Sequence, residues 1–481
     1  MVQLDALVVV PALFALLALG VGRRAPRWPR WIALAAVATQ CALFASLSPS
    51  GVFAGQRIAG VAMRGVAPLW SVALDGLSVP LVVLTLFIGV VAVAVSWRIS
   101  DRPGTYFAII LALQAAVTAV FLAESIILFY VAWECVIIPM YFLIGGWGSS
   151  NRRHAATKYL IYTFAGGAVM LVGVLLAMAE TGGNASMTVI ASAASRMITP
   201  KLVFWLLMAG FVVKLPLVPF HTWLPDAHTE APTAGSIILA GVLLKMGAYG
   251  ILRLAMPFAP SAFQDARPLI AVAGVVGILY GAAMAYVQTD LKRLVAYSSV
   301  AHMGFVALAI AVATPAALGA ALLVMVSHGF VAGMLFLLVG SLYERTHTRE
   351  LGRLGGLGAV APVWSVAFVF GSLASLGLPG LSGFPGEFAS ILEAFRTFGW
   401  PTAVITVGLV LAAAYNLRAV RETVQGPLGE FKEIADLTPL EMTLVSAFAF
   451  GIVWIGLQPG LVLNVADAAL RTLSHAVGGG V

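Results

Sequence analysis

Apolar runs of membrane-spanning length recur along almost the whole sequence, from Gln3 to Gln458, and only short polar segments separate them. A helix needs about 20 mainly apolar residues to cross the ~30 Å of hydrocarbon in a bilayer. The composition agrees with this, because 61% of the residues are hydrophobic, 10% are charged and the mean hydropathy is +1.01. These values exclude an ordinary soluble domain and predict an all-α, polytopic membrane protein that lies in a lipid bilayer.

The runs predict about 14 transmembrane helices. The first is expected to be a retained helix, because it has neither the basic start nor the small-residue cleavage site of a signal peptide. The expected spans are 3–22, 31–52, 76–98, 106–123, 125–147, 155–179, 201–220, 231–256, 268–288, 294–313, 315–343, 360–397, 400–421 and 440–460.

Basic residues are distributed unequally between the alternating connections. Cytoplasmic loops carry the excess of lysine and arginine, and one set of alternate connections contains 17 of the 27 here. This places both termini on the non-cytoplasmic side, and it accounts for most of the net charge of +7 without a nucleic-acid partner. The 17 residues are Arg23, Arg24, Arg27, Arg30, Arg98, Arg102, Arg152, Arg153, Lys158, Lys292, Arg293, Arg345, Arg349, Arg353, Arg418, Arg421 and Lys432.

Motifs for binding a cofactor or a metal are not evident. Cys41 and Cys135 lie in apolar runs without a CxxC pattern, so no disulfide, metal or iron–sulfur site is predicted. The stretch HTWLPDAHTE (221–230) contains residue types that bind zinc, but it lacks the helical spacing of a zinc protease. We expect it to be a cytoplasmic loop. Asp290 precedes an expected helix and is a candidate N-cap.

Two expected spans contain a Leu-Pro pair followed closely by a second proline, in VKLPLVPFHTWLPD (213–226) and SLGLPGLSGFPGEF (375–388). Broken helices at corresponding positions of two halves are typical of transporters with inverted repeats. Two five-helix units, with the break in the fourth helix of each, satisfy this pattern. Chance is the alternative, because proline kinks are common in membrane helices. The expected regions are peripheral helices (1–105), a first repeat (106–257), a second repeat (258–423), and a last helix with a tail (424–481).

A charged side chain near the bilayer centre costs ~3 kcal/mol unless it is compensated, and four charged residues best fit such a position. These four are Glu134, Lys214, Lys245 and Glu387, whereas the other charged residues within the expected spans include ones near span ends. Glu134 and Lys214 belong to the second and fourth helices of the first unit and can face each other. A nearby carboxylate keeps a lysine charged, whereas burial favours the neutral amine, so a change in their separation would release a proton. The alternative is a static salt bridge that fixes helix packing.

Two histidines continue this series. His302 and His328 lie in apolar spans of the second unit, and imidazoles exchange protons near neutral pH. Lys245 supplies a further amine before them, and Glu387 follows them at the second break. The order Glu, Lys, Lys, His, His, Glu predicts a proton path. Each histidine can instead hydrogen-bond a backbone carbonyl between helices.

Several long motifs resemble one protein family. The run KLPLVPFHTWLPDAHTEAPTAGSIILAGVLLKMGAYGILR (214–253) is similar to the proton-translocating, antiporter-like membrane subunits of respiratory complex I, most closely to subunit M, called chain 4 in mitochondria. The similarity covers nearly the whole chain. It includes ALDGLSVPLVVLT (73–85), WECVIIPMYFLIGGWG (133–148), TDLKRLVAYSSVAHMGF (289–305) and LPGLSGFPGEF (378–388).

The resemblance implies a fourteen-helix fold with two inverted five-helix repeats. It implies Glu134 and Lys214 as a coupled pair and Lys245 as the central relay. His302 and His328 would connect this relay to Glu387, which would lead to the far side. Glu387 favours subunit M, because the L and N subunits carry lysine at that position. The long lateral helix of subunit L has no counterpart in this sequence.

The resemblance also implies a proton-pumping subunit of an NADH:quinone oxidoreductase in a bacterial plasma membrane. Its partners would be other membrane subunits, including the neighbouring antiporter-like subunits L and N. NADH, flavin (FMN), iron–sulfur clusters and quinone would belong to partner subunits, with no cofactor in this chain. Two alternatives remain open, namely a subunit of a sodium/proton antiporter and a subunit of a hydrogenase-, ferredoxin- or F420-linked proton pump.

Overall fold

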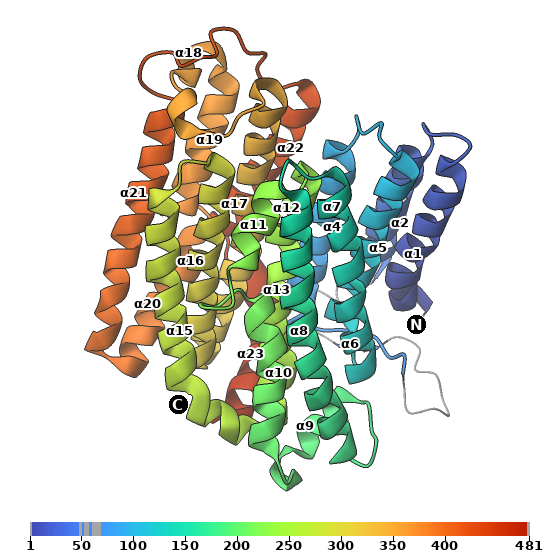
Figure 1. The fold of residues 1–481 in the computed structure, drawn as a ribbon. Coiled ribbons are helices and arrows are strands. Elements are labelled where there is room, and N and C mark those ends of the chain that lie inside the picture. Colours follow the sequence, from blue (N-terminus) through green and yellow to red (C-terminus); the bar gives the residue numbers. More distant parts are fainter. Residues whose placement is uncertain (1, 48–50, 52–56, 60–68, 479–481) are drawn as a thin grey trace.

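The protein is a bundle of long helices (Figure 1). Ten helices of the described part are long and apolar enough to cross a membrane. The prediction of a mainly α-helical, multi-pass membrane fold is therefore confirmed, whereas the number of crossings remains a prediction. In Figure 1 both chain ends lie at one end of the bundle, opposite to the short helix α18 (Leu357–Val360). The computed structural model describes residues 2–47, 51, 57–59 and 69–478.

The first helices pack together at one side of the bundle. Two buried glutamines join them, because Gln40 Nε2 donates to the Leu7 oxygen at 2.7 Å and Gln114 Nε2 donates to Gln40 Oε1 at 2.9 Å. The last residues of the expected span 31–52, at 48–50 and 52, lie outside the described residues. The elements are α1 (Val2–Gly22), α2 (Pro29–Ser46), the antiparallel two-residue strands β1 (Ile58–Ala59) and β2 (Ala73–Leu74), α4 (Val79–Val95) and α5 (Pro103–Leu122).

The first predicted helix break is present. α10 (Pro200–Lys214) ends at Lys214, and helical structure resumes only at α11 (Trp223–Glu230). Pro216 and Pro219 lie between them and supply no backbone N–H for a helical hydrogen bond. The other elements of this region are α6 (Ile126–Cys135), α7 (Ile137–Trp147), α8 (Arg152–Ala179), α9 (Met187–Ser192), η1 (Ala194–Arg196), α12 (Thr233–Ile238), η2 (Leu239–Leu243), α13 (Leu244–Gly250), η3 (Ile251–Ala255) and α14 (Met256–Phe258).

The second predicted break is present as well. α19 (Pro362–Ser375) and α20 (Gly383–Phe398) are separated by a segment in which Gly377 and Gly380 have positive φ. Earlier in the chain, Asp290 caps α16 as predicted, because its Oδ1 accepts from the Arg293 backbone N–H at 2.9 Å. The other elements are α15 (Pro260–Val287), α16 (Leu291–Val312), α17 (Pro315–Thr346), η4 (Leu351–Arg353), η5 (Trp400–Val404) and α21 (Ile405–Thr423).

The C-terminal region contains one helix that was not expected. α22 (Pro439–Leu457) corresponds to the last predicted span, but the predicted tail forms a second helix, α23 (Gly460–Ala476). Buried residues of α23 recur every three or four positions, as in an amphipathic helix, and α23 packs against α17. The buried apolar residues are Val462, Val465, Ala466, Leu470 and Leu473.

The centre of the bundle is formed by α16, α17 and the helical segment from α12 to α14, which are buried on nearly all sides. α8 and α21 are peripheral and expose apolar side chains on their outer faces, as lipid-facing helices do. Polar residues of the central helices are therefore enclosed by protein, and they can remain there only with polar partners.

Candidate functional site

The residues predicted for the proton path lie near the middle of membrane-length helices or beside a helix break. Lys245 is midway between Thr233 and Phe258, His302 lies midway along α16, and His328 lies close to the middle of α17. Lys214 ends α10 at the first break, and Glu387 is in the first turns of α20 after the second break. Glu134 lies in the middle of the Ile126–Trp147 span.

Lys245 is completely buried on α13, between the π-helical segments η2 and η3. Single π-helical turns within helices are frequent at functional sites. Its Nζ donates to the carbonyl oxygen of Ala240 in η2 and lies 2.7 Å from Nδ1 of His328. When Lys245 is charged, its Nζ donates this bond, so Nδ1 of His328 is unprotonated. The protonation state of Lys245 is thereby linked to that of His328.

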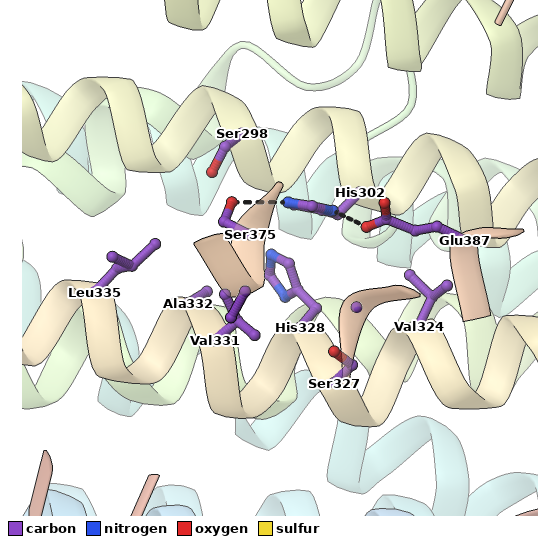
Figure 2. A pocket seen from close by; sticks show the side chains of 12 residues that line it. Ser298, His302, Val324, Ser327, His328, Val331, Ala332, Leu335, Ser375 and Glu387 are labelled. Carbon is purple, nitrogen blue, oxygen red and sulfur yellow. Dashed lines mark hydrogen bonds and ion pairs between the residues drawn. The ribbon is translucent and has the colours of Figure 1, made fainter. Parts of the chain in front are cut away.

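The row of polar side chains continues from His328 to Glu387 (Figure 2). The rings of His328 and His302 have centroids 5.5 Å apart. His302 Nδ1 lies 2.8 Å from Glu387 Oε1, and its Nε2 lies 3.3 Å from Ser375 Oγ. A cavity of ≈ 10 Å³ lies among these side chains, close to the smallest space that holds a water molecule. Lys245, His328, His302 and Glu387 therefore form a row of titratable groups with a close contact at each end and a gap between the two imidazoles.

The backbone at the second break makes room for Glu387. Gly377 has φ +78°, and a Cβ there would lie 3.1 Å from Glu387 Oε2. Ser382, just before α20, bonds Ser327 of α17 through their hydroxyl oxygens at 2.7 Å. The break therefore places a carboxyl group against α17 and leaves space for it.

Glu134 and Lys214 form a separate group. No ion pair within 4.0 Å joins these two described side chains, although they are close enough to interact electrostatically. Lys214 is 1% exposed, and its Nζ lies 5.0 Å from the centre of the Trp133 ring, a cation–π distance. A Cβ at Gly167 would overlap Glu134 Oε1, so the carboxylate occupies the space that the glycine leaves.

Four polar atoms in this group have no hydrogen-bond partner among the described residues. They are Lys214 Nζ, Glu134 Oε1, Trp133 Nε1 and Tyr159 Oη. Buried polar groups rarely remain unpaired. Four such atoms close together indicate a polar region between α6, α8 and α10. The structure thus brings Lys245 into contact with His328, whereas Lys214 Nζ has no hydrogen-bond partner among the described residues.

The prediction of a cytoplasmic loop over residues 221–230 is wrong, because Trp223–Glu230 forms the buried helix α11. His228 is fully buried, its ring stacks on Phe336 at 4.6 Å between centroids, and neither ring nitrogen has a partner in the described part of the chain. His228 lies within electrostatic reach of Lys245 and Lys292. The sequence feature that could have identified His228 is its position in a polar segment directly after a predicted helix break. Among the described residues, no cluster of three metal-binding side chains was found.

Lys292 also belongs to the interior, although the sequence placed it in a loop. It is the second residue of α16 and 5% exposed, and its Nζ donates to the carbonyl oxygen of Ala231, at the end of α11, at 2.5 Å. The sequence could not reveal this burial, because α16 extends into the region that was assigned to the loop.

Comparisons with known proteins agree on one family. A family model described as NADH:quinone oxidoreductase/Mrp antiporter, TM, matches residues 123–412. NADH-quinone oxidoreductase subunit M of Pseudomonas aeruginosa is 41% identical over 84% of this chain and 82% of that protein. Subunit M of Rhodobacter capsulatus is 37% identical over 96% and 93%.

Solved structures show the same fold. A chain of respiratory complex I from Thermus thermophilus with bound NADH has a TM-score of 0.90 and 28% identity, covering 99% of this chain and 100% of that one. A chain of the Mrp complex from Dietzia sp. DQ12-45-1b has a TM-score of 0.87 at 21% identity and covers 100% of both chains. The second likeness concerns the fold alone.

Proposed function

This chain belongs to the NADH:quinone oxidoreductase/Mrp antiporter family of membrane proteins, and we propose that it is the proton-translocating subunit M of a bacterial NADH:quinone oxidoreductase. The relatives that carry this name cover most of the chain at 37–41% identity. In this proposal the chain crosses the plasma membrane fourteen times in two inverted repeats, with both termini on the non-cytoplasmic side. Subunits L and N are its neighbours.

The row from Lys245 to Glu387 is the observation that carries the proposal. A protonated Lys245 passes its proton to His328 along their 2.7 Å contact. The proton then crosses to His302, where the adjoining cavity has room for about one bridging water. His302 delivers it to Glu387 at 2.8 Å. Neutral imidazole accepts at one nitrogen and releases from the other, which suits both histidines to this relay.

Glu134 and Lys214 control the row in this proposal. Their separation leaves Lys214 without a close counter-charge, whereas approach of the carboxylate would hold the lysine proton. Redox chemistry takes place in partner subunits, where NADH, flavin, iron–sulfur clusters and quinone are bound. The conformational energy of quinone reduction would reach this chain as a change in the Glu134–Lys214 distance.

Replacing Glu387 by Gln tests the row. The amide keeps the size of the side chain and most hydrogen bonding but cannot exchange a proton. In the purified complex reconstituted in liposomes, we expect normal assembly and a parallel fall in quinone reductase activity and proton pumping, because a blocked proton path holds back the coupled redox reaction. Glu430→Gln is the matched control, since Glu430 is in an exposed ion pair with Arg353. Normal rate and proton yield in the Glu387 variant would disprove the role of this carboxyl group.

A further inference from the structure

The two imidazoles of the row contact their outer neighbours through the same ring nitrogen. Nδ1 of His328 lies 2.7 Å from Lys245 Nζ, and Nδ1 of His302 lies 2.8 Å from Glu387 Oε1. An imidazole that passes a proton on accepts it at one nitrogen and releases it from the other. A proton that follows the row therefore leaves His328 from Nε2 and reaches His302 at Nε2, so these two atoms define the gap.

One hydroxyl group stands at this gap. Ser375 Oγ lies 3.3 Å from Nε2 of His302, on the side of the ring opposite to Glu387 (Figure 2). Nε2 of His328 is buried and has no hydrogen-bond partner among the described residues. Ser375 and both histidines line the same cavity of ≈ 10 Å³, close to the space of one water molecule. A water at this position can accept from His328 Nε2 and donate to Ser375 Oγ.

Ser375 differs from the other serines that line this cavity. Hydroxyl groups of serines inside helices often bond back to a carbonyl of their own helix, as Ser298 does at 2.7 Å, and Ser327 bonds a second serine hydroxyl at 2.7 Å. Ser375 Oγ instead bonds His302, a member of the row. The buried hydroxyl of Tyr415 on α21 lies near Ser375. The Ser375 hydroxyl is thus directed at the ring nitrogen that has to receive a proton.

We propose that the Ser375 hydroxyl bridges the two imidazoles and completes the proton path between them. Protonated His328 gives its Nε2 proton to the cavity water, the water gives one of its protons to Ser375 Oγ, and the hydroxyl gives its original proton to Nε2 of His302. Water and hydroxyl both end with the composition they had before, and both turn before a second proton can follow. This inference rests on the proposed proton-translocating function and names the group that closes the gap in the row.

Ser375 could alternatively serve only to pack α19 against its neighbours, and two variants of the same shape separate these roles. Ser375→Thr keeps the hydroxyl, whereas Ser375→Val replaces it with a methyl group and leaves no space for a second water. Ser365→Val is the control, because Ser365 is a buried serine of α19 outside the cavity and its hydroxyl has no partner among the described residues.

The measurement is quinone reductase activity and proton pumping by the intact complex in liposomes, in H₂O and in D₂O. A slowed proton-transfer step enlarges the solvent isotope effect, whereas a loss of packing does not. Ser375→Thr is expected to retain most of the wild-type rate. Ser375→Val is expected to lose about tenfold or more and to show a larger isotope effect, because a positioned proton-transfer group contributes at least that much.

Equal losses in Ser375→Thr and Ser375→Val, a wild-type rate in Ser375→Val, or an unchanged isotope effect would overturn the bridging role. Ser375→Ala needs no extra space, and if the larger side chains prevent assembly, a wild-type rate in this variant would overturn the role as well. Glu387→Gln is measured in parallel. If Glu387→Gln is fully active, the proposed function itself fails, and if Glu387→Gln alone is impaired, only the bridging role of Ser375 fails.

Discussion

Single residues determine how this membrane interior can hold charge. Lys214 is buried beside Trp133 and has no hydrogen-bond acceptor among the described residues, and Lys245 instead shares a short contact with His328. A cation with few fixed partners can lose its proton more readily than one held in an ion pair. Neither lysine is held in an ion pair among the described residues, which is the arrangement expected of the proposed proton-exchanging groups.

Lys214→Arg tests this interpretation. We expect the complex to assemble but to lose most of the proton transport through this subunit, with a reduction of roughly 10²-fold in the affected step, because a positioned acid–base group contributes at least that much and guanidinium retains its proton. Acidification of the vesicle interior during NADH oxidation measures the effect. Lys201→Arg is the control, since Lys201 lies on the same helix in an exposed pair with Asp265. Normal pumping by Lys214→Arg would mean that Lys214 provides only fixed charge.

Much of the candidate site could be predicted from the sequence, because a charge in an apolar run is conspicuous. Which charges meet could not be predicted. Lys245 and His328 are 83 residues apart, and His302 and Glu387 are 85 apart, so their contacts depend on helix packing. His228 and Lys292 were missed because their neighbours in sequence are polar, and only the fold reveals that they are buried.

At the scale of elements, the helix breaks were predictable and the short helices were not. Paired prolines identified both interruptions, because proline removes a backbone donor. α11 has eight residues and a polar sequence, and its helical state depends on burial against α8 and α16. α23 follows the last apolar run after a proline, and its amphipathic pattern predicts a helix only if a surface is available to bury it. The π-helical turns around Lys245 have no comparable signal.

One ion pair joins the start of α4 to the helical segment that carries Lys245. Arg253 Nη1 and Nη2 each lie 2.7 Å from a carboxylate oxygen of Asp75. Burial alone would raise the pKa of Asp75, but Arg253 and hydrogen bonds from Ser78 hold it below the ordinary 3.8. The stabilisation is thus present above pH 3.8 and is lost as the pH falls through the lower pKa of the folded state.

Asp75→Asn is expected to destabilise the subunit by about 3 kcal/mol at neutral pH, because it leaves the partly buried Arg253, whose side chain is 24% exposed, without its two charged hydrogen bonds. Thermal unfolding of the purified complex measures the change. Asp467→Asn removes an exposed pair with Arg471 and should have little effect. An unchanged unfolding temperature in Asp75→Asn would show that this contact does not stabilise the link between α4 and η3.

At the scale of the whole molecule, the composition was sufficient to predict a polytopic bundle, but not the arrangement in which α16 and α17 form its centre. Those two helices are as apolar as the outer ones, and lipid and protein neighbours favour the same side chains. Only the distribution of buried polar groups distinguishes them. The number of crossings and the repeat boundaries remain predictions for the same reason.

We expect the chain to purify in mild detergent within a large assembly that includes other antiporter-like subunits and subunits that bind flavin and iron–sulfur clusters. The reason is that its row of proton-exchanging groups requires a source of energy, and its relatives are subunits of NADH-quinone oxidoreductases. Mass spectrometry of the purified assembly provides the measurement. An isolated chain that exchanges sodium for protons would instead support the antiporter alternative.

Lys245, His302 and His328 lie near the middle of their helices, so in the proposed membrane topology the row runs along the membrane plane. A charge that crosses the whole membrane changes in energy by about 2.3 kcal/mol per 100 mV, but a step parallel to the membrane crosses almost none of the voltage. In the proposed proton path, the electric field therefore acts on the entry and exit of a proton and hardly on its passage between the histidines. An energised membrane would oppose release of the proton while leaving the lateral relay nearly as fast as in a membrane at rest.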